Sequence, residues 1–178
     1  MTGTARNPGC CATRADALRL PDCPLLATDG TAVSPGLLRG RAVIYVYPYT
    51  GKPGTADPPG WDAIFGAHGS TPQSLSYSKC YPEFRKHQVK VFGLSNQSTR
   101  WQKEFVARTA LTFPLLSDNA GTFAAAVPLT TFKAGEGDYY VRRSFLIENG
   151  TVVLDRTNVY PPEVDADIML ADVKRRWP

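Results

Sequence analysis

The stretch GSTPQSL, residues 69–75, holds the residue types best suited to chemistry in this chain of 178 residues. Ser70 and Gln73 have the S-x-x-Q spacing of a capping box, in which the serine caps a helix and the glutamine completes the box. Pro72 is tolerated there, because a first helical turn has no partner for the missing N–H. A helix N-terminus beside a sheet edge stabilises anions and thiolates. Chemistry is therefore expected at Ser70, with Thr71 beside it in the pocket.

The segments around this stretch predict a strand, a long loop and a helix. Residues 42–47 are apolar throughout, which is typical of a strand buried on both faces. Residues 48–69 are rich in Gly and Pro, and a loop of this length is usually functional. Residues 70–87 are predicted to be helical, and Pro82 is expected to kink or interrupt the helix. The expected anchors are Trp61, Ile64 and Phe65 in the loop and Leu75, Cys80 and Phe84 in the helix.

The remaining patterns predict an α/β sandwich with a mixed central sheet. Strands joined through helices pair in parallel, whereas the Asn149-Gly150 turn makes an antiparallel hairpin. Ser98 is the expected cap of a second helix. The further strands are expected at 89–95, 113–116, 139–147 and 151–154. The further helices are expected at 99–110, 121–127 and 165–176, the last with Ile168, Met169 and Val173 facing inward.

The composition is that of one ordinary globular domain. Hydrophobic residues make up 43%, charged residues 20%, and the formal net charge is +4. We expect residues 1–19 to be a flexible tail and residues 20–178 to form the domain. The sequence contains neither an apolar run long enough to cross a membrane nor a basic stripe with interleaved aromatics. We therefore expect no membrane, no nucleic acid and a cytoplasmic location.

The cysteines and histidines are too scattered to predict a metal centre. There is no C-x-x-C, and His68 and His87 are far apart in the sequence. We expect free thiols, no metal and no cofactor. The four cysteines are Cys10, Cys11, Cys23 and Cys80.

Taken together, these segments resemble the active-site region of the peroxiredoxins, in particular the bacterioferritin-comigratory, peroxiredoxin Q-like branch. The resemblance extends over residues 20–175. It implies a thioredoxin-like three-layer sandwich and thiol-dependent reduction of hydroperoxides, with a thioredoxin-type reductant. It is carried by residues 43–48, 69–74, 92–95 and 113–118 and by Arg142, Ser144, Phe145, Leu146 and Ile147.

In this family a cysteine thiolate at a helix N-terminus attacks the peroxide and becomes a sulfenic acid, which a second thiol resolves. The resemblance puts the peroxidatic position on Ser70, the resolving position on Leu75 and the family's arginine on Arg142. The family's threonine falls on Ala67, and Thr50 is a candidate to replace it in space. The implied pocket comprises Pro48, Thr50, Trp61, Ser70, Thr71, Leu75 and Arg142.

A serine in the thiolate's position leaves several interpretations open. Ser70 could be an engineered replacement of a cysteine, or the chain could be a diverged relative that binds a small molecule or catalyses a non-redox step. Cys80 could have become the reactive thiol, but it lies ten residues further along the helix, about 15 Å away. A small, half-buried apolar role fits Cys80 better. Cys10 and Cys11 could take part from a flexible tail, and the chain could be a monomer or a homodimer.

Other polar residues can be interpreted as structural as well as catalytic. A Ser-His-Asp triad could use Ser70 with His68 or His87. Because side chains alternate along a strand, only one of Arg142 and Arg143 can face the pocket. A buried Arg142 would favour an anion or a polar pocket beside it. Asp165 and Asp167 are expected to interact with a helix dipole, and Lys103, Glu104 and Arg108 to form a solvated face.

Overall fold

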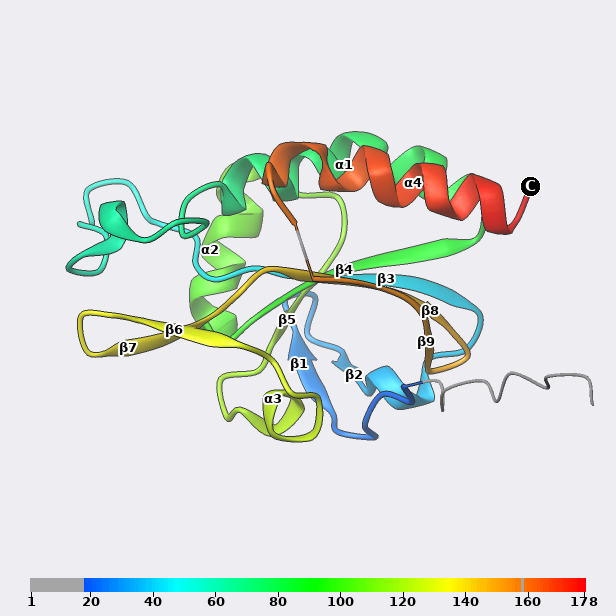
Figure 1. Cartoon of the computed structure of the whole chain (residues 1–178), viewed down its shortest axis with the longest axis horizontal. Helices are drawn as coiled ribbons and strands as arrows, with labels where there is room; N and C mark the ends of the chain where they lie inside the picture. Colours follow the sequence, from blue (N-terminus) through cyan, green and yellow to red (C-terminus); the bar gives the residue numbers. More distant parts are fainter. Residues whose placement is uncertain (1–17, 158) are drawn as a thin grey trace, which may run out of the picture.

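The computed structural model describes residues 18–157 and 159–178, which form one α/β unit around a seven-stranded sheet (Figure 1). The strand order is β2-β1-β5-β4-β3-β8-β9. β3, β4 and β5 pair in parallel, whereas the outer strands pair antiparallel, so the mixed sheet is confirmed. The strands of this sheet are β1 (Leu25–Ala27), β2 (Ala32–Val33), β3 (Arg41–Val46), β4 (Val89–Ser95), β5 (Leu115–Ser117), β8 (Arg143–Glu148) and β9 (Thr151–Arg156).

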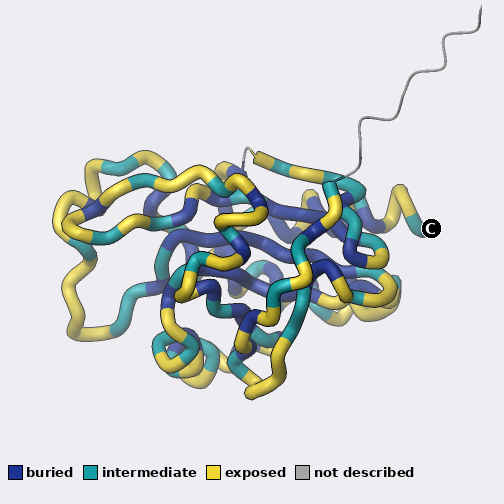
Figure 2. Tube along the Cα trace, turned by 90° about the horizontal axis from the view of Figure 1, so that it is seen from below, coloured by how far each residue is buried: buried dark blue, intermediate teal, exposed yellow. Residues whose placement is uncertain are grey.

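Helices cover both faces of this sheet and give three layers. β3 supplies alternate side chains to two cores: Tyr45 packs with residues of α1, α2 and α4, and Ile44 packs with a residue of α3 on the other face. Burial on both faces explains why β3 is apolar throughout. Figure 2 shows the central strands as the most buried part of the trace. The helices are α1 (Ser70–Lys86), α2 (Thr99–Thr109), α3 (Thr122–Ala126) and α4 (Asp165–Arg176).

The helix α1 differs from the expectation in two ways. It continues through Pro82, so the expected interruption is wrong. Leu75 is 43% exposed, so its expected inward position is also wrong. The buried side of α1 is instead largely polar near its beginning, which hydrophobic periodicity does not detect. Its buried residues are Ser70, Gln73, Ser74, Tyr77, Cys80 and Phe84, the last two as expected.

A second, two-stranded sheet covers the long loop between β3 and α1. It consists of β6 (Thr131–Ala134) and β7 (Gly137–Tyr140), and the sequence patterns did not predict it. Because the chain leaves β7 before it enters β8, the single strand expected at 139–147 is wrong. Gly135 N donates to Pro59 O at 2.9 Å and joins this hairpin to the loop. The loop and the hairpin therefore form one projecting lobe beside the main sheet (Figure 1).

Three short 3₁₀ helices complete the described elements, and some anchors differ from those expected. Trp61 is 3% exposed and Met169 and Val173 are fully buried, as expected. Phe65 is 81% exposed and Ile168 38% exposed, so their inward positions are wrong. The 3₁₀ helices are η1 (Pro35–Leu37), η2 (Trp61–Ala63) and η3 (Pro162–Val164).

The beginning of the domain lies before residue 20. Arg19 forms a bridge with Thr151, and Leu20 is 3% exposed within the core. The tail expected at 1–19 therefore does not include Arg19, and residues 1–17, with Cys10 and Cys11, lie outside the described part of the chain. Among the described residues, no helix combines the length and apolar character needed to cross a membrane.

Candidate functional site

The first turn of α1 holds Ser70 in a geometry different from the expected capping box. Gly69 occupies the cap position with φ of 104°, and Gln73 N donates to Gly69 O at 3.0 Å. Ser70 is the first helical residue, is 3% exposed and makes no capping hydrogen bond. The capping box is therefore wrong, and the hydroxyl of Ser70 is left for other partners. A Cβ at position 69 would overlap Pro162 Cγ, so glycine is required there for both conformation and space.

Arg142 reaches this turn from the chain segment immediately before β8. Its Nη2 donates to Ser70 Oγ at 3.2 Å and to His68 O at 2.7 Å, and its Nη1 donates to Gln73 Oε1 at 2.6 Å. Burial lowers the pKa of Arg142 to about 10, and the nearby charge of Asp165 opposes that shift. The sequence expectation that Ser70 and Arg142 lie together is thus confirmed in space.

Arg143, the first residue of β8, has partners different from those of Arg142. Its Nη2 donates to Asp155 Oδ2 at 2.6 Å on β9, and this carboxylate raises the pKa of Arg143. Only Arg142 therefore serves the site.

Behind Arg142 lies a buried polar network centred on Asp165. Its Oδ2 accepts hydrogen bonds from Tyr77 Oη at 2.7 Å, Ser144 Oγ at 2.7 Å and Gln73 Nε2 at 3.2 Å. Asp165 is 1% exposed, so it does more than interact with the dipole of α4. Through Gln73 it connects indirectly to Arg142, and the network holds the guanidinium in position.

A polar cleft of about 310 Å³ opens in front of Ser70. Its positively charged side chains come from separate elements, Lys52 from the loop and Arg108 from α2, and Asp57 adds a carboxylate from the loop. Arg108 therefore borders the cleft rather than belonging to a purely solvated face. Trp61 and Thr71 line the cleft, as expected of pocket residues. The full lining is Tyr49, Gly51, Lys52, Pro53, Asp57, Trp61, Ala67, His68, Gly69, Ser70, Thr71, Pro72 and Arg108.

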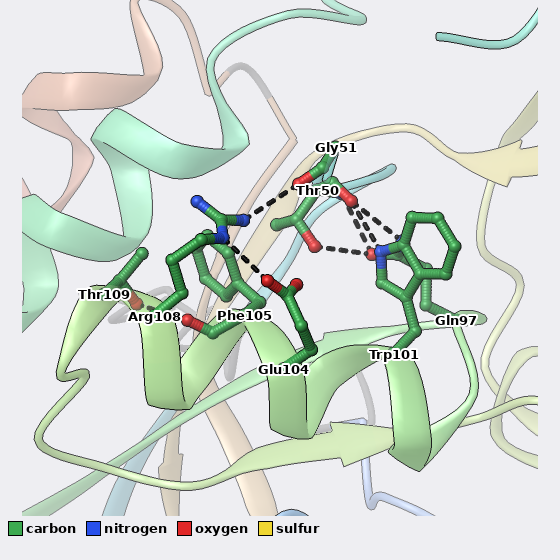
Figure 3. A network of polar contacts seen from close by, with 8 residues as sticks. All are labelled: Thr50, Gly51, Gln97, Trp101, Glu104, Phe105, Arg108 and Thr109. Atoms are coloured by element: carbon green, nitrogen blue, oxygen red, sulfur yellow. Dashed lines mark hydrogen bonds and ion pairs between the residues drawn. The ribbon is translucent and has the colours of Figure 1, made fainter. Parts of the chain in front are cut away.

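Hydrogen bonds join the first residues of the long loop in front of Ser70, Thr50 and Gly51, to α2 (Figure 3). Thr50 Oγ1 donates to Gln97 Oε1 at 3.0 Å, and Trp101 Nε1 donates to Thr50 O at 2.6 Å. Arg108 Nη2 donates to Gly51 O at 2.9 Å. The hydroxyl of Thr50 is thus engaged with Gln97, and Thr50 does not line the cleft.

Pro48 and Leu75, also expected in the pocket, do not line it either. Pro48 is buried just after β3, where the chain leaves the sheet, and Leu75 points to solvent. Leu75 offers no thiol and no contact to the cleft.

Cys80 occupies a very different setting on the same helix. Its Sγ donates to Asp167 Oδ1 at 3.4 Å, and burial together with Asp167 raises the pKa of Cys80 to about 11. A thiol of this kind is protonated and unreactive near neutral pH. The interpretation of Cys80 as a small buried apolar residue therefore fits better than that of a reactive thiol.

His68 is near Ser70 in sequence, but its ring faces elsewhere. Nε2 of His68 lies 2.8 Å from Asp62 Oδ1, and Ser70 Oγ is bonded by Arg142 instead. A triad through His68 is not formed. Together with Asp57, these side chains place three ligand-type atoms within 4.8 Å of one another, all on exposed residues. Since the His68–Asp62 contact already explains that cluster, it does not by itself indicate a metal centre.

The functional importance of Gln73 and Asp165 was missed by sequence reasoning. Gln73 has capping spacing and Asp165 begins a helix, and local rules assign both to helix ends. Gln73 bonds to Arg142, which is 69 residues away in the sequence, and to Asp165, which is 92 residues away. No local signal could reveal either connection.

Comparisons with known proteins show the family of the chain. A family model described as Redoxin matches residues 15–172. The chain is 29% identical over 164 residues to the putative chloroplastic peroxiredoxin Q of Oryza sativa subsp. indica, covering 90% of this chain and 67% of the relative. It is 28% identical over 137 residues to peroxiredoxin Bcp of Xanthomonas campestris pv. campestris, covering 75% of this chain and 72% of the relative.

A solved structure extends the likeness to the fold. The bacterioferritin comigratory protein of Xanthomonas campestris matches with a TM-score of 0.71 at 28% sequence identity, covering 92% of this chain and 100% of that one. The thioredoxin-like class expected from the sequence is thereby confirmed.

Proposed function

The chain belongs to the redoxin family and resembles its peroxiredoxin Q and Bcp members, and from this premise we propose that its site is built for thiolate-based reduction of hydroperoxides. We propose further that the chain does not perform this reaction through Ser70. The observation that carries the proposal is the 3.2 Å hydrogen bond from Arg142 Nη2 to Ser70 Oγ in the first turn of α1. A helix N-terminus and a guanidinium are the two groups that lower the pKa of a thiol at such a position.

The expected reaction uses a thiolate at position 70. The sulfur attacks one peroxide oxygen, the O–O bond breaks, and the leaving alkoxide takes a proton to become an alcohol. The sulfur is oxidised to a sulfenic acid while the hydroperoxide is reduced. Arg142 stabilises the thiolate and the charge that develops on the leaving oxygen. A serine hydroxyl stays protonated near neutral pH and has no sulfenic acid chemistry, so Ser70 cannot carry out this step.

The relatives support a proposal for the substrate and the reductant. The Xanthomonas campestris protein is described by its alkyl peroxide reduction activity, which favours an organic hydroperoxide as the substrate of the ancestral site. We propose a thioredoxin-type dithiol as reductant of a thiol-containing form, acting directly on the sulfenic acid because Leu75 offers no resolving thiol. The cytoplasm remains the proposed location.

The test is to restore the thiol with Ser70→Cys. After one equivalent of tert-butyl hydroperoxide, a dimedone adduct at position 70 should appear in the mass spectrum, with loss of one free thiol. Ser78→Cys is the matched control, because Ser78 lies on α1 about two turns beyond the N-terminus. It should form no adduct at position 78, and the original chain none at Ser70. If folded Ser70→Cys reacts no faster than Ser78→Cys, the proposal is wrong.

A further inference from the structure

A second cleft, of about 420 Å³, lies between the beginning of α2 and β7. Tyr49 lines this second cleft as well as the cleft in front of Ser70. Two further lining residues follow neighbouring strands, since Asn96 comes directly after β4 and Asn119 lies two residues after β5. β4 and β5 are parallel, so their carboxyl ends meet at one edge of the sheet, where α/β folds commonly place small-molecule sites.

The ring of Trp101 lines the second cleft and is held in place by two contacts. Its Nε1 donates to Thr50 O at 2.6 Å (Figure 3). Lys52 Nζ lies 4.2 Å from the ring centroid, but Lys52 itself lines the cleft in front of Ser70 and not the second cleft. Both contacts are made before any ligand binds, so little order has to be gained on binding.

Two tyrosine rings complete the aromatic surface of the second cleft. The ring centroid of Tyr49 lies 5.5 Å from that of Trp101 and 5.8 Å from that of Tyr139. A Cβ at position 137 would lie 2.8 Å from Tyr139 Oη, so Gly137 makes room for this ring. The negative faces of such rings attract the slightly positive C–H groups of a ligand.

The polar groups of the second cleft can both donate and accept hydrogen bonds. Asn96 Nδ2 donates to Asp138 O at 2.6 Å, which leaves Asn96 Oδ1 as a further acceptor. Asn119 is exposed, and its amide offers both a donor and an acceptor. Burial raises the pKa of Tyr49 and that of Tyr139, so both phenols stay protonated and can donate. The second cleft thus suits a ligand that carries several hydroxyl groups.

Charge distinguishes the second cleft from the cleft in front of Ser70. Lys52 and Arg108 line the cleft in front of Ser70, whereas none of the described residues that line the second cleft is a lysine or an arginine. The carboxylate of Asp138 lies 3.3 Å from Lys133 Nζ, which balances its charge. None of the same lining residues has an aliphatic side chain, so the apolar surface comes from the aromatic rings. The lining therefore favours neither an anion nor an aliphatic chain.

We propose that the second cleft binds a neutral saccharide. One C–H face of the sugar ring packs on the aromatic surface, and the sugar hydroxyls pair with the amides of Asn96 and Asn119 and with the two phenols. The first turn of α1 takes no part in this binding. The proposal therefore goes beyond the proposed peroxidase ancestry and can succeed or fail independently of it.

Saturation-transfer NMR of the full chain with maltose, cellobiose and lactose tests the proposal. At least one of these neutral disaccharides should bind with a dissociation constant of about 1 mM or below. Glucuronate should bind no more tightly than glucose, because the described lining residues include no lysine or arginine. Absence of binding by all three disaccharides, or tighter binding of glucuronate, would overturn the proposal. Binding of adenosine in place of the disaccharides would assign the cleft to a planar base and reject the saccharide.

Two tyrosine variants locate the binding. Tyr139→Ala removes one ring of the aromatic surface and should weaken binding of the disaccharide about tenfold. Tyr160→Ala is the matched control, because Tyr160 is 58% exposed and lies outside the lining of the second cleft. It should leave the dissociation constant unchanged, and equal effects of the two variants would contradict the proposed site.

Two milder variants keep the test decisive if Tyr139→Ala does not fold. Asn119→Ala removes an exposed amide and should weaken binding about fivefold, as expected for one lost hydrogen bond. Gly137→Ala keeps every polar group of the lining but displaces the ring of Tyr139, so it should weaken binding as well. Undiminished binding by both variants, with unchanged circular dichroism spectra, would reject the second cleft as the saccharide site.

Discussion

Two positions on α1 give opposite surroundings to a side chain that can lose a proton. At its beginning, Ser70 meets Arg142 and an uncapped helix N-terminus, which together favour negative charge. Ten residues later, Cys80 meets burial and the carboxylate of Asp167, which oppose negative charge and raise the pKa of the thiol to about 11.

The comparison separates the residue from its environment. The chain has a thiol where a thiolate is destabilised and a hydroxyl where a thiolate would be stabilised. Residue type alone would identify Cys80 as the redox centre, whereas the electrostatics identify the position of Ser70. The reactivity of a thiol on this helix is therefore decided by its distance from the helix N-terminus and by the charged residues around it.

The largest effect is expected from a thiol at position 70. A thiol with a pKa near 7 and one with a pKa near 11 should differ about 100-fold in alkylation rate at pH 7, once the lower intrinsic nucleophilicity of the more acidic thiol is included. Iodoacetamide labelling of Ser70→Cys, followed by peptide mass spectrometry, measures both thiols in one sample. Equal alkylation rates at positions 70 and 80 would contradict the inferred difference between their surroundings.

Removal of the arginine should reverse much of that advantage. In the Ser70→Cys background, Arg142→Gln should raise the thiol pKa by about 1–2 units, since a cation within hydrogen-bond reach is lost. The pKa of the added thiol is read from the absorbance near 240 nm between pH 4 and pH 10, after the titration of the chain with Ser70, which holds the same four other cysteines, is subtracted. Arg143→Gln in the same background is the control and should leave the pKa of this thiol unchanged.

The geometry of the first turn should also matter for stability. Gly69→Ala should lower the free energy of unfolding by about 2 kcal/mol, because of the positive φ and the overlap with Pro162. Gly54→Ala is the matched control, since it also has a positive φ, of 76°, but no atom near an added Cβ. It should cost about 1 kcal/mol. Urea titration monitored by tryptophan fluorescence measures both, and equal losses would show that Pro162 is not a constraint.

The smallest effect is expected at Cys80. Asp167→Asn removes the carboxylate but leaves burial, the larger cause of the raised pKa. The alkylation rate of Cys80 at pH 8 should therefore rise only about threefold to tenfold. An unchanged rate would mean that burial alone protects the thiol.

Much of the site was predictable because its signals are local. Gly and Pro around residue 69 mark the end of a loop, and alternation along the predicted strand puts Arg142 and Arg143 on opposite sides, although Arg142 lies just before β8. The error at Leu75 has an equally local cause. Hydrophobic periodicity assigns leucine to the core, but the buried side of α1 begins with Ser70, Gln73 and Ser74, which bond to buried polar partners.

The sequence by itself determined the alternation of strands and helices, the helix that begins at Ser70 and a strand beside Arg142. Only the tertiary structure decided that Gln73 joins Arg142 to Asp165, that Thr50 turns to Gln97, and that the β6–β7 hairpin covers the loop. Periodicity and capping are properties of neighbouring residues, whereas hydrogen bonds and charge balance depend on which distant residues the fold brings together.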